Sequence, residues 1–223
     1  MDNCRYIIMC GGSYLRWSEP RQLLRIHDEP IVSRTIRLLK EEGVSDIAIS
    51  SNDSRFEGLG VPVLQHTNEY VADGQILAGY WHECFYPTDE PTCYIFGDVV
   101  FSPEAIHTIV ATETDDIQFF ASAPPFDKRY VKPYAEPFAL KVVDTKHLES
   151  AKIVVEQYAR IGWFKRKPIM WELWQVITDH KLNHIDYSSY VAINDYTCDI
   201  DSPEDLKRIE PYVPYEIKAE VIG

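Results

Sequence analysis

Gly11 and Gly12 end a short apolar run, and two arginines, Arg16 and Arg21, follow shortly after them. Glycines let a backbone come close to a phosphate and offer its N–H groups. An arginine can hold phosphate oxygens through two parallel hydrogen bonds. A plain strand-to-loop turn with solvated arginines would carry the same residues. This group therefore becomes informative only in combination with others.

Carboxylates that could hold a divalent cation occur at two further places. Asp98 follows a continuous apolar run. Asp199 and Asp201 stand just before a predicted helix start, and a turn or helix cap is the alternative role for each of the three. Mg²⁺ typically takes one or two carboxylates and completes its coordination with water and substrate phosphates. With a phosphate loop and basic side chains, these carboxylates form the set needed for nucleotidyl transfer, which depends on positioning and charge neutralisation.

The elements that must position these residues alternate between strand and helix patterns. Short apolar runs predict strands, and apolar spacings of three to four residues predict helices. We expect strands at 5–10, 46–51, 62–65, 92–96, 117–123, 138–143 and 190–193. We expect helices at 30–43, 74–85, 103–111, 146–160 and 169–180, and a last one with Ser202 as N-cap and Pro203 as first residue. The predicted fold is α/β, with a mostly parallel central sheet, helices on both faces, and ligands beyond the carboxyl ends of the strands.

Composition narrows the range of functions. The chain has 223 residues, 45% of them hydrophobic, which favours a single domain over 1–223. Its formal net charge of −13 argues against nucleic acid as a partner, since that binding takes a basic face. Charged residues interrupt every apolar stretch, and the first residues are too polar for a signal peptide, so we expect a cytoplasmic protein without membrane contact. Five cysteines without a C-x-x-C spacing favour reduced, packed thiols.

The order of the motifs resembles the nucleotidyltransferase superfamily with the glycosyltransferase-A-like fold, which includes sugar-phosphate and choline-phosphate nucleotidylyltransferases. The resemblance rests on three blocks, at 10–53, at 94–106 (YIFGDVVFSPEAI) and at 198–210 (CDIDSPEDLKRIE). It implies a Rossmann-like fold of the nucleotide-diphospho-sugar transferase type. Residues 1–112 would form the nucleotide-binding half and residues 113–223 the acceptor-binding half.

The same resemblance assigns roles around the phosphates. Gly11 and Gly12 match the loop that wraps the nucleotide phosphates. Cys10 stands at the start of this loop and is assigned to it, with a packed thiol as its alternative role. Arg16 and Arg21 match the basic groups that hold the phosphates and neutralise the leaving pyrophosphate.

Metal and acceptor residues are assigned in the same way. Asp98 matches the metal-binding aspartate after the central strand. Asp201 matches the second metal ligand, with Asp199 as the alternative, and the implied cofactor is Mg²⁺. Lys132 lies in the densest basic stretch of the chain and matches a lysine near the acceptor phosphate.

Residues 66–70 resemble the Asn-Glu-x-Tyr run of the bacterial choline-phosphate cytidylyltransferases. Asn68, together with Gly74 shortly after it, is therefore assigned to the nucleotide site, and CTP is the favoured nucleotide. The resemblance implies an enzyme that joins an NTP to a phosphorylated small metabolite and releases pyrophosphate. Surface-glycan or related biosynthesis is the expected context, and a homo-oligomer is compatible with the sequence.

Two other functions stay open. A glycosyltransferase of the same fold ought to carry an Asp-x-Asp at the central strand end, where this chain has Asp98-Val99-Val100. A non-catalytic nucleotide-binding protein is favoured by Tyr14 and Leu15, which stand where the superfamily's phosphate loop has a glycine and a hydroxyl residue.

Overall fold

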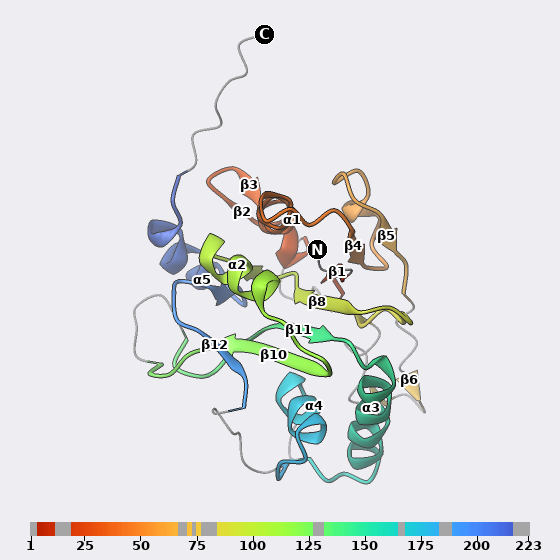
Figure 1. Ribbon diagram of the computed structural model, residues 1–223. Helices are drawn as coiled ribbons and strands as arrows, with labels where there is room; N and C mark the ends of the chain where they lie inside the picture. The colour runs from red at the N-terminus through yellow and green to blue at the C-terminus, as the bar shows by residue number, and fades with distance from the viewer. Residues whose placement is uncertain are drawn as a thin grey trace.

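The computed structural model describes residues 4–11, 19–66, 71–72, 75–76, 84–126, 132–164, 168–182 and 189–215. Within these ranges the molecule is built on one seven-stranded sheet with the strand order β12-β10-β11-β8-β1-β4-β5 (Figure 1). In chain order these strands are β1 (Arg5–Met9), β4 (Ile47–Ser50), β5 (Val63–Leu64), β8 (Thr92–Phe96), β10 (Ile117–Ser122), β11 (Pro137–Val142) and β12 (Val191–Ile193).

The strands of this sheet run mostly in one direction. The pairs β1–β4, β1–β8, β4–β5 and β10–β12 are parallel. Only β11 is reversed, because it pairs antiparallel with both β8 and β10. The α/β fold with a mostly parallel sheet, predicted from the alternating patterns, is confirmed.

Helices cover both faces of the sheet. Among the described residues they are α1 (Ile31–Glu41), α2 (Pro103–Ala111), α3 (Thr145–Arg160), α4 (Met170–Ile177) and α5 (Pro203–Ile209). Helices α1 and α2 pack on one face, and α3 and α4 on the other (Figure 1). None of the helices in the described part of the chain is long and apolar enough to cross a membrane.

Strand β1 illustrates why the central strands read as continuous apolar runs. Successive side chains of a strand point to opposite faces of its sheet. Tyr6 and Ile8 pack in the core shared with α1 and α2, whereas Ile7 and Met9 pack in the core shared with α3 and α4. Both faces are therefore buried, as a parallel sheet between two helical layers requires.

In the described part of the chain, three two-stranded ribbons lie outside the main sheet. They are β2 (Arg25–Ile26) with β3 (Glu29–Pro30), β6 (Val71–Ala72) with β7 (Gln75–Ile76), and β9 (Val99–Val100) with β13 (Cys198–Asp199). The helix predicted over 74–85 is wrong at its start, where β7 pairs antiparallel with β6. Asp73-Gly74 separates the two strands, and Asp-Gly between short apolar runs is a strong hairpin signal. Residues 77–83 of the predicted helix lie outside the described ranges.

All five cysteines are buried and reduced, as expected from their spacing. Cys10 and Cys93 are fully buried in the core beneath α1 and α2. Burial raises the pKa of the Cys10 thiol well above its ordinary value, and the charge of Asp98 adds to the effect. These thiols act as small apolar groups in the packing.

Candidate active site at the carboxyl ends of the central strands

The ends of β1 and β8 lie against each other at the edge of the sheet where the predicted site residues gather. The Gly97 N–H donates to the Met9 carbonyl at 3.0 Å. A Cβ at position 97 would lie 2.6 Å from that carbonyl oxygen and 2.7 Å from Cys10 Sγ. Only glycine allows this close approach, and it fixes where the next residue, Asp98, leaves the sheet.

Gly11 is required for a second close approach. A Cβ there would lie 2.1 Å from Cys84 Sγ and 3.0 Å from His66 Nε2. His66 is buried, bonds through Nδ1 to Ser50 Oγ at 2.9 Å, and has its pKa lowered by burial. A neutral imidazole and a thiol therefore support the backbone at the start of the predicted phosphate loop.

Arg21 joins the two carboxylates that were predicted as metal ligands. It lies in a 3-10 helix, η1 (Arg21–Leu23), directly after Pro20. Its Nη2 lies 2.7 Å from Asp98 Oδ2, and its Nη1 contacts Asp201 Oδ1 and donates to the Ile200 carbonyl at 3.2 Å. Burial pushes the pKa of Arg21 down, but the charges of Asp98, Asp199 and Asp201 outweigh it and the pKa is raised.

Pairing between β9 and β13 brings the two carboxylate groups of the sequence together. Asp199 pairs with Val99 in the antiparallel ribbon, and the Ile200 N–H donates to the Asp98 carbonyl at 3.0 Å. Two segments about a hundred residues apart thus place their aspartates beside one another. The Asp-x-Asp motif of a glycosyltransferase is absent here, as the sequence indicates, because Asp98 is followed by Val99 and Val100. Both valines are buried in the ribbon.

Lys132 forms the centre of the second half of the site. Its side chain is only 5% exposed, and its Nζ lies 2.6 Å from Asp201, 3.0 Å from Glu136, 3.4 Å from Asp199 and 3.7 Å from Asp205. Burial lowers the pKa of Lys132, but the charges of Asp199 and Glu136 and the hydrogen bond to Asp201 outweigh that effect, so the pKa is raised. The lysine is a buried, fully charged counter-ion.

The two aspartates of the third block respond differently to this setting. Burial raises the pKa of Asp199 well above its ordinary value, and the charges of Asp98 and Asp201 add to it. Burial also pushes the pKa of Asp201 upward. The hydrogen bond and charge of Lys132 and the charge of Arg21 outweigh that effect, so the pKa of Asp201 is lowered. Asp201 is therefore the firmly ionised member of the pair.

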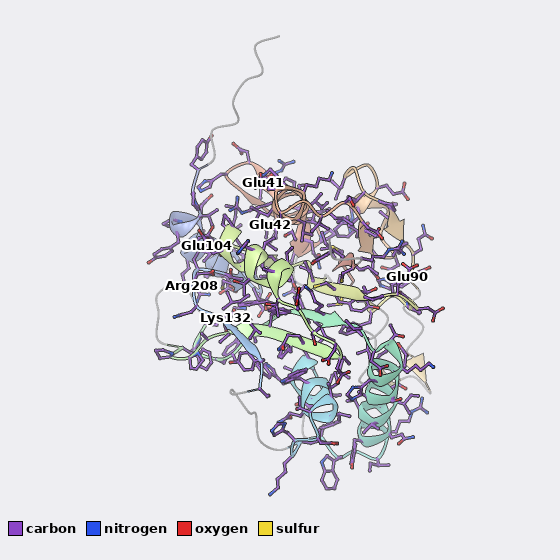
Figure 2. The ribbon with its side chains drawn as sticks, viewed as in Figure 1. Glu41, Glu42, Glu90, Glu104, Lys132 and Arg208 are labelled. Atoms are coloured by element: carbon purple, nitrogen blue, oxygen red, sulfur yellow. The ribbon has the colours of Figure 1, made fainter. Side chains whose placement is uncertain are left out.

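Two acidic residues of the cluster were missed in the sequence. Glu136 is 1% exposed, lies beside Lys132, and accepts the Asp199 N–H at 3.3 Å. Asp205 accepts N–H groups of Asp201 and Ser202, which fixes the loop that carries Asp201. No local pattern singles out Glu136. Figure 2 shows Lys132 and Arg208 on the side of the molecule where α5 packs.

The structure therefore brings four predicted residues into one cluster: Arg21, Asp98, Lys132 and Asp201. Asp199, the alternative ligand, belongs to the same cluster.

Cys10 and Gly11 adjoin the cluster through the ends of β1 and β8. The Cys10 N–H donates to the Ser50 carbonyl, and its own carbonyl accepts from Ser51 Oγ. The remaining predicted site residues lie outside the described ranges: Gly12, Arg16, Asn68 and Gly74. Tyr14 and Leu15 also lie outside them.

The donor chemistry fits a hard divalent cation. Asp98, Asp199 and Asp201 present carboxylate oxygens, and Asp199 Oδ1 is buried with no hydrogen-bond partner among the described residues. In the described part of the chain no three His, Cys, Asp or Glu side chains are grouped so that they could hold a metal ion. Two carboxylates suffice for Mg²⁺ when substrate phosphates and water complete the shell. Asp98 and Asp201 are the pair that would hold it.

Solved structures of other proteins share the fold of this chain. The T. maritima inositol-1-phosphate CTP transferase superimposes with a TM-score of 0.57 at 13% identity, covering 94% of this chain and 97% of the other. A Bacillus anthracis protein assigned as a glucose-1-phosphate thymidylyltransferase gives 0.52 at 14% identity, covering 94% of each chain. Such identities establish a shared fold only.

No curated protein sequence matches the chain significantly. Residues 6–152 match the model of the MobA-like NTP transferase domain, which is well over half of the chain. The resemblance found in the sequence blocks is confirmed by this match. The chain belongs to the MobA-like NTP transferase domain family of the nucleotidyltransferases.

Proposed function

We propose that this protein transfers a nucleotidyl group from an NTP to the phosphate of a small metabolite and releases pyrophosphate. The observation that carries the proposal is the convergence of Arg21, Asp98 and Asp201 at the carboxyl ends of β1 and β8. Ligands of open α/β sheets bind at such strand ends. Family membership supports the same reaction class.

The reaction needs no side-chain nucleophile. An oxygen of the acceptor phosphate attacks the α-phosphorus and forms a new P–O bond. The bond to the bridging oxygen of the β-phosphate breaks, and pyrophosphate leaves with the electron pair. Arg21 neutralises charge on the leaving group, and Lys132 orients the acceptor side of the site. Asp98 and Asp201 would hold Mg²⁺, which would supply positive charge beside the reacting phosphates.

The finer parts of the proposal come from the sequence. CTP is the favoured nucleotide, because residues 66–70 resemble a cytidylyltransferase run. Gly12, Arg16, Asn68 and Gly74 complete the nucleotide site with Cys10 and Gly11, in the half formed by residues 1–112. The structural neighbours named for CTP transfer to inositol-1-phosphate and for glucose-1-phosphate support a phosphorylated polyol or sugar as acceptor. Cytoplasmic surface-glycan biosynthesis is the proposed context.

A pyrophosphate-release screen tests the function. Four NTPs are each combined with Mg²⁺ and a panel of phosphorylated sugars, polyols and amino-alcohols. We expect release with CTP and one acceptor class, and none when EDTA removes the metal. Asp98→Asn should lower kcat by about a hundredfold or more, because it removes a charge that holds the metal at the reacting phosphates.

Asp46→Asn is the matched control. Asp46 pairs with Arg5 at the opposite end of β1, so the control removes an aspartate charge of the same kind away from the site. Its turnover should equal that of the parent protein. Tight NTP binding without pyrophosphate release for any acceptor would instead identify a non-catalytic nucleotide-binding protein. Unchanged turnover of Asp98→Asn would remove Asp98 from the mechanism.

A further inference from the structure

Arg21 lies between the two carboxylates to which a metal ion would bind. Its two terminal nitrogens contact different aspartates, Nη2 the Oδ2 of Asp98 and Nη1 the Oδ1 of Asp201. A planar guanidinium can span two carboxylates in this way, whereas a lysine ammonium is a point charge. One oxygen of each aspartate is thereby engaged by the same cation.

The contact is built into the fold. The Ile200 carbonyl accepts from Arg21 Nη1 at 3.2 Å and orients the guanidinium toward Asp201. The other oxygen of Asp201, Oδ2, is held by Lys132 at 2.6 Å. The Asp98 side chain is 15% exposed, so solvent screens its contact with Arg21 only in part.

A divalent ion and the guanidinium compete for these two carboxylates. Each is attracted by the negative charge of Asp98 and Asp201, and two cations at such short range repel each other. Arg21 is about one quarter exposed and can turn toward another anion, whereas Lys132 is enclosed by four carboxyl groups. The natural exchange partner for a guanidinium is a phosphate, which it binds through two parallel hydrogen bonds.

We propose that Arg21 is a built-in counter-cation that keeps Asp98 and Asp201 closed to a divalent ion until nucleotide phosphates draw its guanidinium away. This inference rests on the proposed function, because it takes the phosphates of that substrate as the releasing group. Metal and nucleotide then bind with positive coupling, since each is favoured by the state in which Arg21 has left the carboxylates. Free metal alone binds weakly.

Mn²⁺ binding to the nucleotide-free protein tests this directly. Free Mn²⁺ is titrated by electron paramagnetic resonance with the parent protein, Arg21→Gln and Arg21→Lys. We expect Arg21→Gln to bind Mn²⁺ about tenfold or more tightly than the parent, and Arg21→Lys to lie between them. Arg55→Gln, which removes an arginine from the ion pair with Asp53 elsewhere on the molecule, should leave Mn²⁺ binding unchanged.

Two further measurements locate the effect. Adding Asp98→Asn to Arg21→Gln should abolish the gain, because the carboxylate charge that Arg21 vacates is then gone. Sulfate, an anion that can engage a guanidinium, should tighten Mn²⁺ binding to the parent relative to chloride at equal ionic strength. It should have no such effect on Arg21→Gln.

Equal Mn²⁺ affinity of Arg21→Gln, Arg21→Lys and the parent would overturn the proposal, as would a gain that survives Asp98→Asn. An equal sulfate effect on the parent and on Arg21→Gln would overturn the coupling. Circular dichroism checks that each variant is folded, and Arg21→Lys, which keeps the charge, preserves the test if Arg21→Gln does not fold. These measurements of Mn²⁺ binding use no substrate and no turnover. Their result can therefore be told apart from a failure of the proposed reaction.

Discussion

At the scale of single residues, the site is a set of charges that neutralise one another. Arg21 and Lys132 each contact two or more carboxyl groups, and Asp201 contacts both of them. Removing one member leaves its buried partners uncompensated, which costs more than the ion pair itself contributes. Substitutions here therefore affect stability as well as binding, and the two effects must be measured separately.

Lys132→Met tests both roles of the buried lysine. We expect the free energy of unfolding to fall by about 3 kcal/mol, because Glu136 and Asp199 lose their cation while buried. If Lys132 also orients the acceptor, KM for the acceptor should rise much more than KM for the NTP. Urea unfolding and steady-state kinetics provide the two readouts.

Lys141→Met is the matched control for this prediction. Lys141 is equally buried, on β11, and donates to the carbonyls of Val110 and Thr112. Its loss should reduce stability without changing the ratio of the two KM values. A Lys132→Met protein as stable as the parent would show that the carboxyl groups do not depend on the lysine.

At the scale of elements, the start of α5 fixes the position of Asp201. Ser202 is the N-cap and Pro203 the first residue, as predicted, and Ser202 forms a capping box with Asp205. Asp205 Oδ2 accepts from the N–H of Asp201 at 3.0 Å and of Ser202 at 2.9 Å. The helix start therefore orders the backbone of the proposed metal ligand, in addition to satisfying its own N–H groups.

Ser202→Ala should affect both stability and catalysis. Loss of the cap is expected to cost about 1 kcal/mol of unfolding free energy. Because the capping box also holds the Asp201 loop, kcat should fall as well. Asp144→Ala removes the N-cap of α3, which packs on the other face of the sheet, and should cost similar stability with unchanged kcat. Equal kcat in both variants would show that the cap does not position Asp201.

At the scale of the whole molecule, a net charge of −13 opposes the binding of a polyanionic nucleotide. The described cations of the site are already paired: Arg21 with Asp98 and Asp201, Lys132 with its carboxyl groups, and Arg208 with Asp205. Positive charge that enters with the nucleotide would add to that of Arg16, which is proposed to hold the phosphates and lies outside the described residues. A divalent cation is the simplest source.

We expect thermal stabilisation by the nucleotide to depend on metal. CTP with Mg²⁺ should raise Tm by several degrees, since about 1 kcal/mol of binding linkage shifts Tm by about 2–4 °C in a chain of this size. CTP with EDTA should give little or no shift, and Mg²⁺ alone should give little. Differential scanning calorimetry measures all three. An equal shift with CTP in EDTA would show that protein cations alone suffice to hold the nucleotide.

The sequence by itself determined most of the elements. Short apolar runs predicted the central strands. Apolar spacing, prolines and N-caps predicted helices, and the predictions of α2 over 103–111 and of the start of α5 match the structure. These features depend on neighbours within a few residues, so the local sequence contains them. The helix predicted at 74–85 is wrong at its start, where β7 pairs with β6, and residues 77–83 of that prediction lie outside the described ranges.

Only the tertiary structure decided how the charges meet. Pairing of β9 with β13 places Asp98 beside Asp199, and burial places Glu136 against Lys132. Nothing in the local sequence indicated that the guanidinium of Arg21 would span Asp98 and Asp201. Such contacts join segments far apart in the chain, and their energies depend on burial and on distances that long-range packing sets. The sequence therefore predicted which residues could do the chemistry, and the fold decided which of them hold one another.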